Sequence, residues 1–414
     1  MSFKKFTAPT ISLPKGTKYL PQNSLVLVST GIPSLDDVLG GGLALGSVIL
    51  VEEDNLTGYS KILQSLFEAQ AIASDQSILI VKQGLSSVSQ LSLPNFLNNI
   101  KTEKNNSSTN QQPEAPNPET EKMKIAWRYE KQDVSNNMRN TNKNNSSDDY
   151  CSAFDISSNL PLNIIQEAKV HCIDSFQLSP QDSNLSTRIL ESQNFEKSKS
   201  DSTKLDHYIS PYHILFDKVS TFLESEFSSL KPQSRDSKRQ ASRISIQISG
   251  SLLDINNKCE ILEFIHSLKG LLRYSYSACM ISFPVNFFVD GLTGKRHSLV
   301  HRIENLCDAV VELESFEGSS QDPSKTLKIQ KSVTNSSSNE YHGLFHTHKL
   351  LCLNSLVSSA GKLSLLASTG GGSSNNLAFK LRRKKFSIET YHLPVEGGTN
   401  ERRVPETSKK SIDF

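Results

Sequence analysis

Short apolar strands alternate with amphipathic helices along much of this chain, and that alternation limits the folds open to it. Apolar side chains recur at helical spacing over 58–73, between two apolar runs at 46–53 and 77–82. The same periods predict further helices over 213–227, 259–272 and 296–306, and further strands over 24–29, 243–249, 278–284 and 308–315. Strands and helices in this order favour an α/β domain with a mainly parallel sheet flanked by helices.

The composition lowers the number of domains that the length would allow. Hydrophobic residues make up 36% of the 414 residues, and with the 20 glycines the apolar share stays below the roughly 45–50% of ordinary globular domains. Polar tracts such as KNNSSTN and NMRNTNKNNSSDD account for the deficit, because they cannot bury enough surface to offset chain entropy. We therefore expect a single domain over 23–394, with a flexible arm over 1–22 and a flexible tail over 395–414.

Five polar stretches inside that domain are expected to be long disordered insertions in surface loops, which cost little extra closure entropy. They lie near 101–122, 131–150, 178–204, 316–340 and 368–376. Between the first two stands Met123–Tyr129, an apolar and aromatic island that holds the single tryptophan. We expect this island to form a strand or an anchor that is pinned to the fold.

Charge and cysteine content exclude several classes of protein. Lys and Arg number 45 against 43 Asp and Glu, so the chain is no histone-like polycation, although a local nucleic-acid site stays open. No apolar run approaches the roughly 18 residues of a membrane span, and the first residues lack the apolar core of a secretory signal. Six scattered cysteines without a CxxC pair indicate reduced thiols in the cytosol or nucleus, and argue against a zinc site built on paired cysteines.

The connection from the strand at 46–53 to the following helix stands where a phosphate-binding loop, GxxxxGK[ST], would lie. Gly58 and Ser60 fit this pattern, whereas Glu53 replaces the first glycine and Tyr59 replaces the lysine. Tyrosine cannot supply the positive charge that meets the β- and γ-phosphates, and the three consecutive acids at 52–54 repel a polyanion. The loop is thus degenerate and nucleotide binding doubtful; the plainer alternative is an ordinary strand–turn–helix joint.

The segment before this loop strengthens the phosphate-loop interpretation. The stretch STGIPSLDDVLGGGLALGSVIL at 29–50 resembles the segment that leads into the phosphate loop of RecA- and KaiC-like ATPases. Such ATPases also place an aspartate at the end of an apolar strand, but the strand at 243–249 ends in Ser249 without a carboxylate. Asp174 is either a substitute or an ordinary strand-end acid. We therefore predict a RecA-like fold that does not hydrolyse ATP on its own.

Four stretches together resemble the PAXNEB family, whose members are the fourth subunit of the Elongator complex. They are residues 29–63, MKIAWRYE at 123–130, LFHTHKLLCLNSL at 344–356 and LAFKLRRKKFSIETYHLP at 377–394. The tract at 101–122 looks longer than the family needs, and RISIQISGSLLD at 243–254 fits only loosely. An active RecA- or KaiC-like ATPase with an irregular loop, and a recombinase-like module that binds DNA, remain as alternatives.

The resemblance implies a non-catalytic RecA-like subunit without a cofactor of its own, in the cytoplasm and nucleus. It implies a hetero-hexameric ring with Elongator subunits five and six, two copies of each, with ATP at the interfaces between ring subunits. The ring would bind tRNA and join the remaining subunits, among them the radical-SAM and acetyltransferase subunit that modifies the wobble uridine. No membrane partner is implied.

Two groups of basic residues are candidates for contact with tRNA phosphates or with an acidic partner. The first is the run of Lys380, Arg382, Arg383, Lys384 and Lys385. Charges on both faces of a strand exclude a central buried position, so we expect this run at an edge, in a loop or on a contact surface. The second group is Lys295 and Arg296.

Three histidines, His342, His346 and His348, stand at strand spacing that would place them on one face. A metal would need a third or fourth ligand and supporting partners, and the sequence identifies none. We therefore expect a half-buried strand with polar tips and no metal site.

Overall fold

The computed structural model describes residues 13–53, 57–97, 150–178, 210–228, 240–249, 252–253, 258–289, 296–316, 341–356 and 377–391. The five expected insertions fall almost entirely outside these ranges. So do the tryptophan island at 123–129, Lys295 and the expected C-terminal tail.

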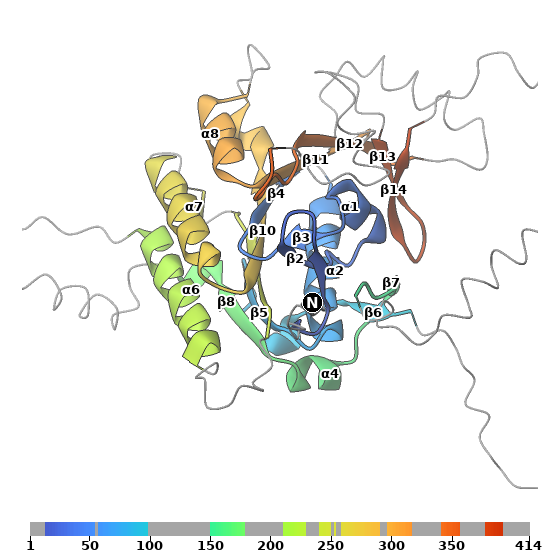
Figure 1. Cartoon of the computed structure of the whole chain (residues 1–414), viewed down its shortest axis with the longest axis horizontal. Coiled ribbons are helices and arrows are strands. Elements are labelled where there is room, and N and C mark those ends of the chain that lie inside the picture. Colours follow the sequence, from blue (N-terminus) through green and yellow to red (C-terminus); the bar gives the residue numbers. More distant parts are fainter. Residues whose placement is uncertain are drawn as a thin grey trace, which may run out of the picture.

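One large sheet runs through the molecule, and most of its strands are parallel (Figure 1). Its order is β14 (Phe386–Thr390), β13 (Leu377–Leu381), β12 (Gly343–Lys349), β11 (Ala309–Ser315), β4 (Val48–Glu53), β10 (Ser277–Pro284), β9 (Ser242–Gln247), β5 (Ser77–Lys82) and β8 (Val170–Asp174). The six strands from β11 to β8 are parallel to one another, and β12, β13 and β14 extend the sheet antiparallel. The mainly parallel α/β sheet expected from the sequence is confirmed.

Helices cover both faces of this sheet (Figure 1). One face carries α1 (Pro33–Val38) and α2 (Tyr59–Ala73), and the other carries α6 (Pro211–Ser228), α7 (Lys258–Arg273) and α8 (Ser298–Leu306). Alternate residues of β4 explain this layering, because Ile49 and Val51 pack toward α2 while Val48 and Leu50 pack toward α7. Every long helix predicted from the apolar period is present. None of the helices described is long and apolar enough to cross a membrane.

Smaller elements surround the α2 face. Strands β1 (Thr17–Leu20), β2 (Leu25–Val28) and β3 (Leu43–Ala44) form an antiparallel sheet, and β6 (Pro94–Phe96) pairs with β7 (Phe154–Asn159) near the short helix α4 (Leu162–Glu167). Strand β1 falls inside the expected flexible arm, so the boundary at residue 22 is too late. Local sequence patterns do not reveal β1, because it is only half-buried and is held by backbone hydrogen bonds to β2.

The glycine-rich segment at 31–42 allows close packing between β2 and α2. Gly31 has φ +83°, and a Cβ there would stand 2.5 Å from the Leu66 carbonyl oxygen. Gly42 has φ +130°, and its Cβ would stand 2.6 Å from the Val28 carbonyl oxygen. Only glycine fits these two positions, so the segment brings α1 and β3 against the sheet ahead of β4.

Candidate functional site

Tyr59, at the position where the phosphate-loop pattern has lysine, is the first residue of α2 and packs against the C-terminal strands. Its ring lies edge-on to Phe379 of β13, with centroids 4.8 Å apart, and 6.2 Å from the ring of His342. Phe379 is fully buried in the core on the α2 face. The lysine position is therefore occupied by an aromatic anchor for β13, which explains why tyrosine suits it.

The two positions that match the phosphate-loop pattern do not behave like a phosphate cradle. Gly58 has φ −101°, and a Cβ added to it would meet nothing within 4 Å, so its place does not require glycine. The Ser60 hydroxyl is buried without a hydrogen-bond partner among the described residues, as is one carboxylate oxygen of Glu53. Residues 54–56 lie outside the described ranges. The doubtful nucleotide binding of this loop stays a prediction.

Asp174 is a strand-end acid that organises the loops around β8. Its carboxylate accepts hydrogen bonds from the Gly84 and Phe176 amides at 2.8 and 2.9 Å, and from the Ser86 hydroxyl at 3.2 Å. Burial alone would raise the pKa of Asp174, but these donors outweigh it and hold the pKa below its usual range. Three strands separate β8 from β4, so Asp174 does not stand in for a magnesium ligand beside the loop.

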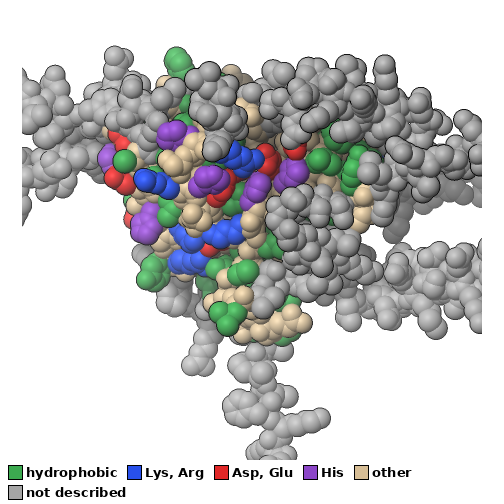
Figure 2. Space-filling view, turned by 90° about the horizontal axis from the view of Figure 1, so that it is seen from above, with side chains coloured by type: hydrophobic (Ala, Val, Ile, Leu, Met, Phe, Trp, Pro, Cys, Tyr) green, Lys and Arg blue, Asp and Glu red, His purple; other side chains and the backbone are tan. Residues whose placement is uncertain are grey.

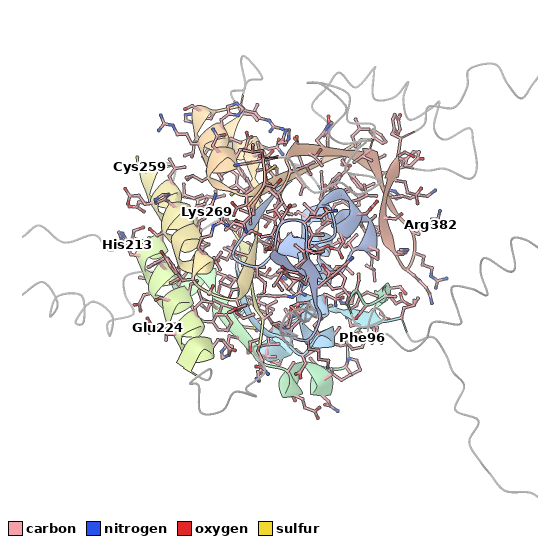
Figure 3. The ribbon with its side chains drawn as sticks, in the orientation of Figure 1. Phe96, His213, Glu224, Cys259, Lys269 and Arg382 are labelled. Carbon is pink, nitrogen blue, oxygen red and sulfur yellow. The ribbon has the colours of Figure 1, made fainter. Side chains whose placement is uncertain are left out.

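The basic run forms a hairpin turn at the edge of the sheet rather than one extended strand. Arg382 and Lys385 close the turn between β13 and β14 through backbone hydrogen bonds of 2.8 and 3.3 Å. The side chains of Arg382 and Lys384 are about 60% exposed, and Arg382 projects from the side of the molecule opposite α6 and α7 (Figure 3). Lys384 lies 3.2 Å from Asp155. Lys380 differs from the other members, because it is buried in β13 with its Nζ above the Tyr341 ring.

A cavity of about 280 Å³ lies beside this turn, between α2, β7 and β14. Its lining is mostly apolar, and Leu66, Leu97 and Phe154 contribute to it. Lys384 and Lys385 are its charged lining residues. The exposed cations of the turn thus border a concave apolar surface.

A second cluster of charged residues gathers around Arg296, at the carboxyl end of β4 and on the face opposite Tyr59. Arg296 donates to Glu52 at 2.9 Å and to Glu312 at 2.5 Å, and it lies 3.4 Å from Glu304 of α8. Glu52 and Glu312 are partners in the register of β4 and β11, and Glu52 is fully buried. Three carboxylates already neutralise Arg296, which argues against its predicted contact with nucleic-acid phosphates.

His348 of β12 completes this cluster. Its Nε2 lies 2.7 Å from Glu312 and 3.7 Å from Glu52. Figure 2 looks onto the upper side of Figure 1, where α8, β11 and β12 lie, and shows acidic, basic and histidine side chains next to one another. His346 pairs with Glu314 at 2.7 Å on the same face as His348. His342 instead precedes β12, contacts Tyr59 and accepts a bond from a β13 amide, so the three histidines do not share one environment.

The two central carboxylates of the cluster have opposite pKa shifts. Burial raises the pKa of Glu52 to about 8; the charge of Arg296 opposes this shift, and Glu312 and Glu304 add to it. Burial would also raise the pKa of Glu312, but the His348 hydrogen bond and the Arg296 charge lower it to about 2. Arg296 itself has a raised pKa, because its carboxylates outweigh its partial burial. Negative charge therefore exceeds what one arginine can balance.

Comparison with known proteins finds similarity along nearly the whole chain. The family model described as PAXNEB protein matches residues 10–414. This chain belongs to the PAXNEB protein family. It is 30% identical to Elongator complex protein 4 of Danio rerio, over 97% of this chain and 90% of the relative. It is 32% identical to Elongator complex protein 4 of Homo sapiens, over 92% of this chain and 80% of the relative. With Elongator complex protein 4 of Schizosaccharomyces pombe the identity is 25%, over the full length of both.

Sequence reasoning missed the Arg296 cluster of this PAXNEB chain. In the sequence, Glu52 stands out only as an acid that repels phosphate, and Glu312 only as part of an expected strand. The available signal was that both acids lie in short apolar strands, where a carboxylate needs a partner. The sequence does not show that β4 and β11 are neighbours in the sheet, so it does not reveal that the two acids lie side by side.

Proposed function

We propose that this chain is a non-catalytic, RecA-like subunit of the Elongator complex that supports modification of the wobble uridine of tRNA. Membership of the PAXNEB family and the full-length similarity to proteins named Elongator complex protein 4 support the assignment to Elongator. The observation that carries the non-catalytic role is Tyr59, which fills the lysine position of the phosphate loop and packs on Phe379. A RecA-like fold is supported by β4, which lies inside the parallel sheet and leads into a strand–loop–helix connection.

In-line phosphoryl transfer needs a cation on the transferred phosphate and an acid that holds magnesium. Here the cation position is aromatic, and β9 ends at Gln247, followed directly by Ile248 and Ser249 and not by a carboxylate. The chain would therefore hold no nucleotide cofactor of its own, and any ATP in the assembly would lie at interfaces between ring subunits.

An ATP-turnover assay on the purified chain tests the absence of catalysis. We expect no turnover above that of buffer, and no change on Ser60→Ala. Turnover that Ser60→Ala abolishes would favour the alternative, an active ATPase with an irregular phosphate loop.

The proposed assembly is a hetero-hexameric ring with two copies each of this chain and of Elongator subunits five and six. Co-expression followed by native mass measurement tests it, and the expected mass is that of the six-chain ring. A chain that stays apart from both subunits and prefers duplex DNA to tRNA would instead fit a recombinase-like module.

We propose that the turn of Arg382, Arg383, Lys384 and Lys385 contributes to tRNA binding by the ring. The turn is exposed at a sheet edge, and although Arg382 and Lys384 each lie near one acid, their side chains are about 60% exposed, which suits contact with phosphates. The triple variant Arg382→Glu/Arg383→Glu/Lys385→Glu should lower the affinity of the assembled ring for tRNA and reduce the salt dependence of binding.

A matched control keeps the same change in net charge. It carries Lys169→Glu, Lys218→Glu and Arg302→Glu, which lie on other elements of the fold. Equal affinity and salt slope in wild type and turn variant would contradict the proposed contact. An equal loss in the control would show a general charge effect instead.

A further inference from the structure

Three neighbouring strands bring oxygen and nitrogen donors together at the Arg296 cluster. Glu52 of β4, Glu312 of β11 and His348 of β12 each offer one donor atom, and these atoms lie within 4.8 Å of one another. Donors that share one metal ion at roughly 2.0–2.2 Å stand about 3–4 Å apart, so small side-chain movements suffice. The donors stand on adjacent paired strands, which hold their relative positions better than loops would.

A second observation comes from the hydrogen bonding of Glu52. Its side chain is fully buried, yet its Oε1 has no hydrogen-bond partner within the part of the chain that the structure describes, while Oε2 faces Arg296 and His348. A buried carboxylate oxygen without a partner is costly in a folded protein. A cation held by this carboxylate would supply the missing interaction.

The charge of the cluster fits a divalent ion. Three carboxyl groups, those of Glu52, Glu304 and Glu312, lie next to a single arginine, so acidic groups outnumber basic ones in the cluster. Arg296 bonds Oε2 of Glu52 and Oε1 of Glu312, and His348 lies against Oε2 of Glu312. An ion would therefore replace the contact between His348 and Glu312 and would meet Oε1 of Glu52, which has no hydrogen-bond partner among the described residues. Arg296 would then orient the ligands from outside, as supporting residues do at metal sites.

We propose that Glu52, Glu312 and His348 form a binding site for a divalent transition-metal ion of the Zn²⁺ class. Two carboxylates and one imidazole suit zinc, whereas magnesium prefers oxygen ligands alone. His348 is one-third exposed, so the ion could enter from solvent and keep an open coordination position. The site lies on the opposite face of the sheet from Tyr59 and is independent of the function proposed above.

Zinc binding to the full-length chain tests this site. The chain carries Cys259→Ser and Cys352→Ser, because these two exposed thiols could bind zinc themselves. After treatment with a chelator, Zn²⁺ is titrated in competition with a fluorescent zinc indicator, and Mg²⁺ is titrated in parallel. We expect one zinc ion per chain, with Mg²⁺ binding far more weakly.

The matched variants are His348→Ala and His346→Ala, which remove neighbouring imidazoles from the same face of β12. His348→Ala should weaken zinc binding about tenfold or more, and His346→Ala should leave it unchanged. Glu52→Gln should weaken it as well, and if that variant fails to fold, the histidine pair decides. Absence of zinc binding in the parent chain, or equal affinity in the parent and His348→Ala, would overturn the proposal.

Discussion

Arg243 and Arg296 lie on opposite faces of the same sheet and have opposite surroundings. Arg243 of β9 is fully buried on the α2 face, where it donates to the Ser29 carbonyl at 2.6 Å and to Gln76 at 2.7 Å, and stacks on Phe67. Burial lowers the pKa of Arg243 to about 10, and the charge of Asp36 offsets part of that effect. Arg296 is partly exposed and contacts three carboxylates, which raise its pKa.

The difference separates a structural arginine from one that belongs to a candidate binding site. Arg243 contacts mainly neutral oxygen atoms and an aromatic ring, and these contacts join the segment after β2 to α2 and β9. Arg296 has more acidic neighbours than it can neutralise, and its cluster is open to solvent at His348. An excess of charge, rather than burial alone, marks the second arginine as part of a site.

The largest expected effect is that of Arg243→Met. It removes donors from the Ser29 carbonyl and Gln76, and leaves the buried Asp36 without a nearby positive charge. The free energy of unfolding should fall by about 3 kcal/mol or more, measured by chemical denaturation. Arg243→Lys keeps the charge but loses the planar guanidinium, so its free energy of unfolding should lie between those of the wild type and Arg243→Met. A loss below about 1 kcal/mol for Arg243→Met would show that the two arginines do not differ as described.

A smaller effect is expected for Arg296→Met in the absence of added metal. Because Arg296 is partly exposed, its removal should lower the free energy of unfolding by about 1 kcal/mol. The double variant Arg296→Met/Glu52→Gln should recover much of this loss, since the buried carboxylate no longer needs a cation. Strictly additive effects of the two substitutions in a double-mutant cycle would contradict the coupling.

Salt should affect the two arginines differently. Raising the sodium chloride concentration from 0.05 M to 1 M shortens the screening length to about 3 Å, which weakens partly exposed ion pairs more than buried contacts. The destabilisation caused by Arg296→Met should shrink at high salt, while that of Arg243→Met should stay nearly constant. Paired denaturation curves at the two concentrations measure this, and equal salt sensitivity would argue against the distinction.

The smallest effect concerns tRNA. Since Arg296 is already paired with carboxylates, Arg296→Met should leave the tRNA affinity of the assembled ring unchanged, in contrast to the variants in the turn at 382–385. Filter binding at two salt concentrations compares them. A loss for Arg296→Met as large as for the turn variant would restore Arg296 as a candidate for RNA contact.

Local periodicity was enough to predict most of the sheet and helices. The helix over 58–73 and the strand over 77–82 match α2 and β5 within a residue, because hydrophobic spacing in a short window determines which face is buried. The expectation that the basic run lies outside a buried strand holds for residues 382–385 but is wrong for Lys380, which is buried in β13 between β12 and β14, because the pairing of these strands is not encoded locally. Strand β1 was not predicted either, because it is only half-buried and depends on its pairing with β2.

The sequence by itself determined that Tyr59 stands where the phosphate-loop pattern has lysine, because this follows from spacing along one stretch of chain. It also determined the alternation of strands and helices. Only the tertiary structure decided that Phe379 covers Tyr59, and that Glu52, Glu312 and His348 meet around Arg296. Residues about 260 positions apart become neighbours through the order of strands in the sheet, which long-range packing sets and local patterns do not encode.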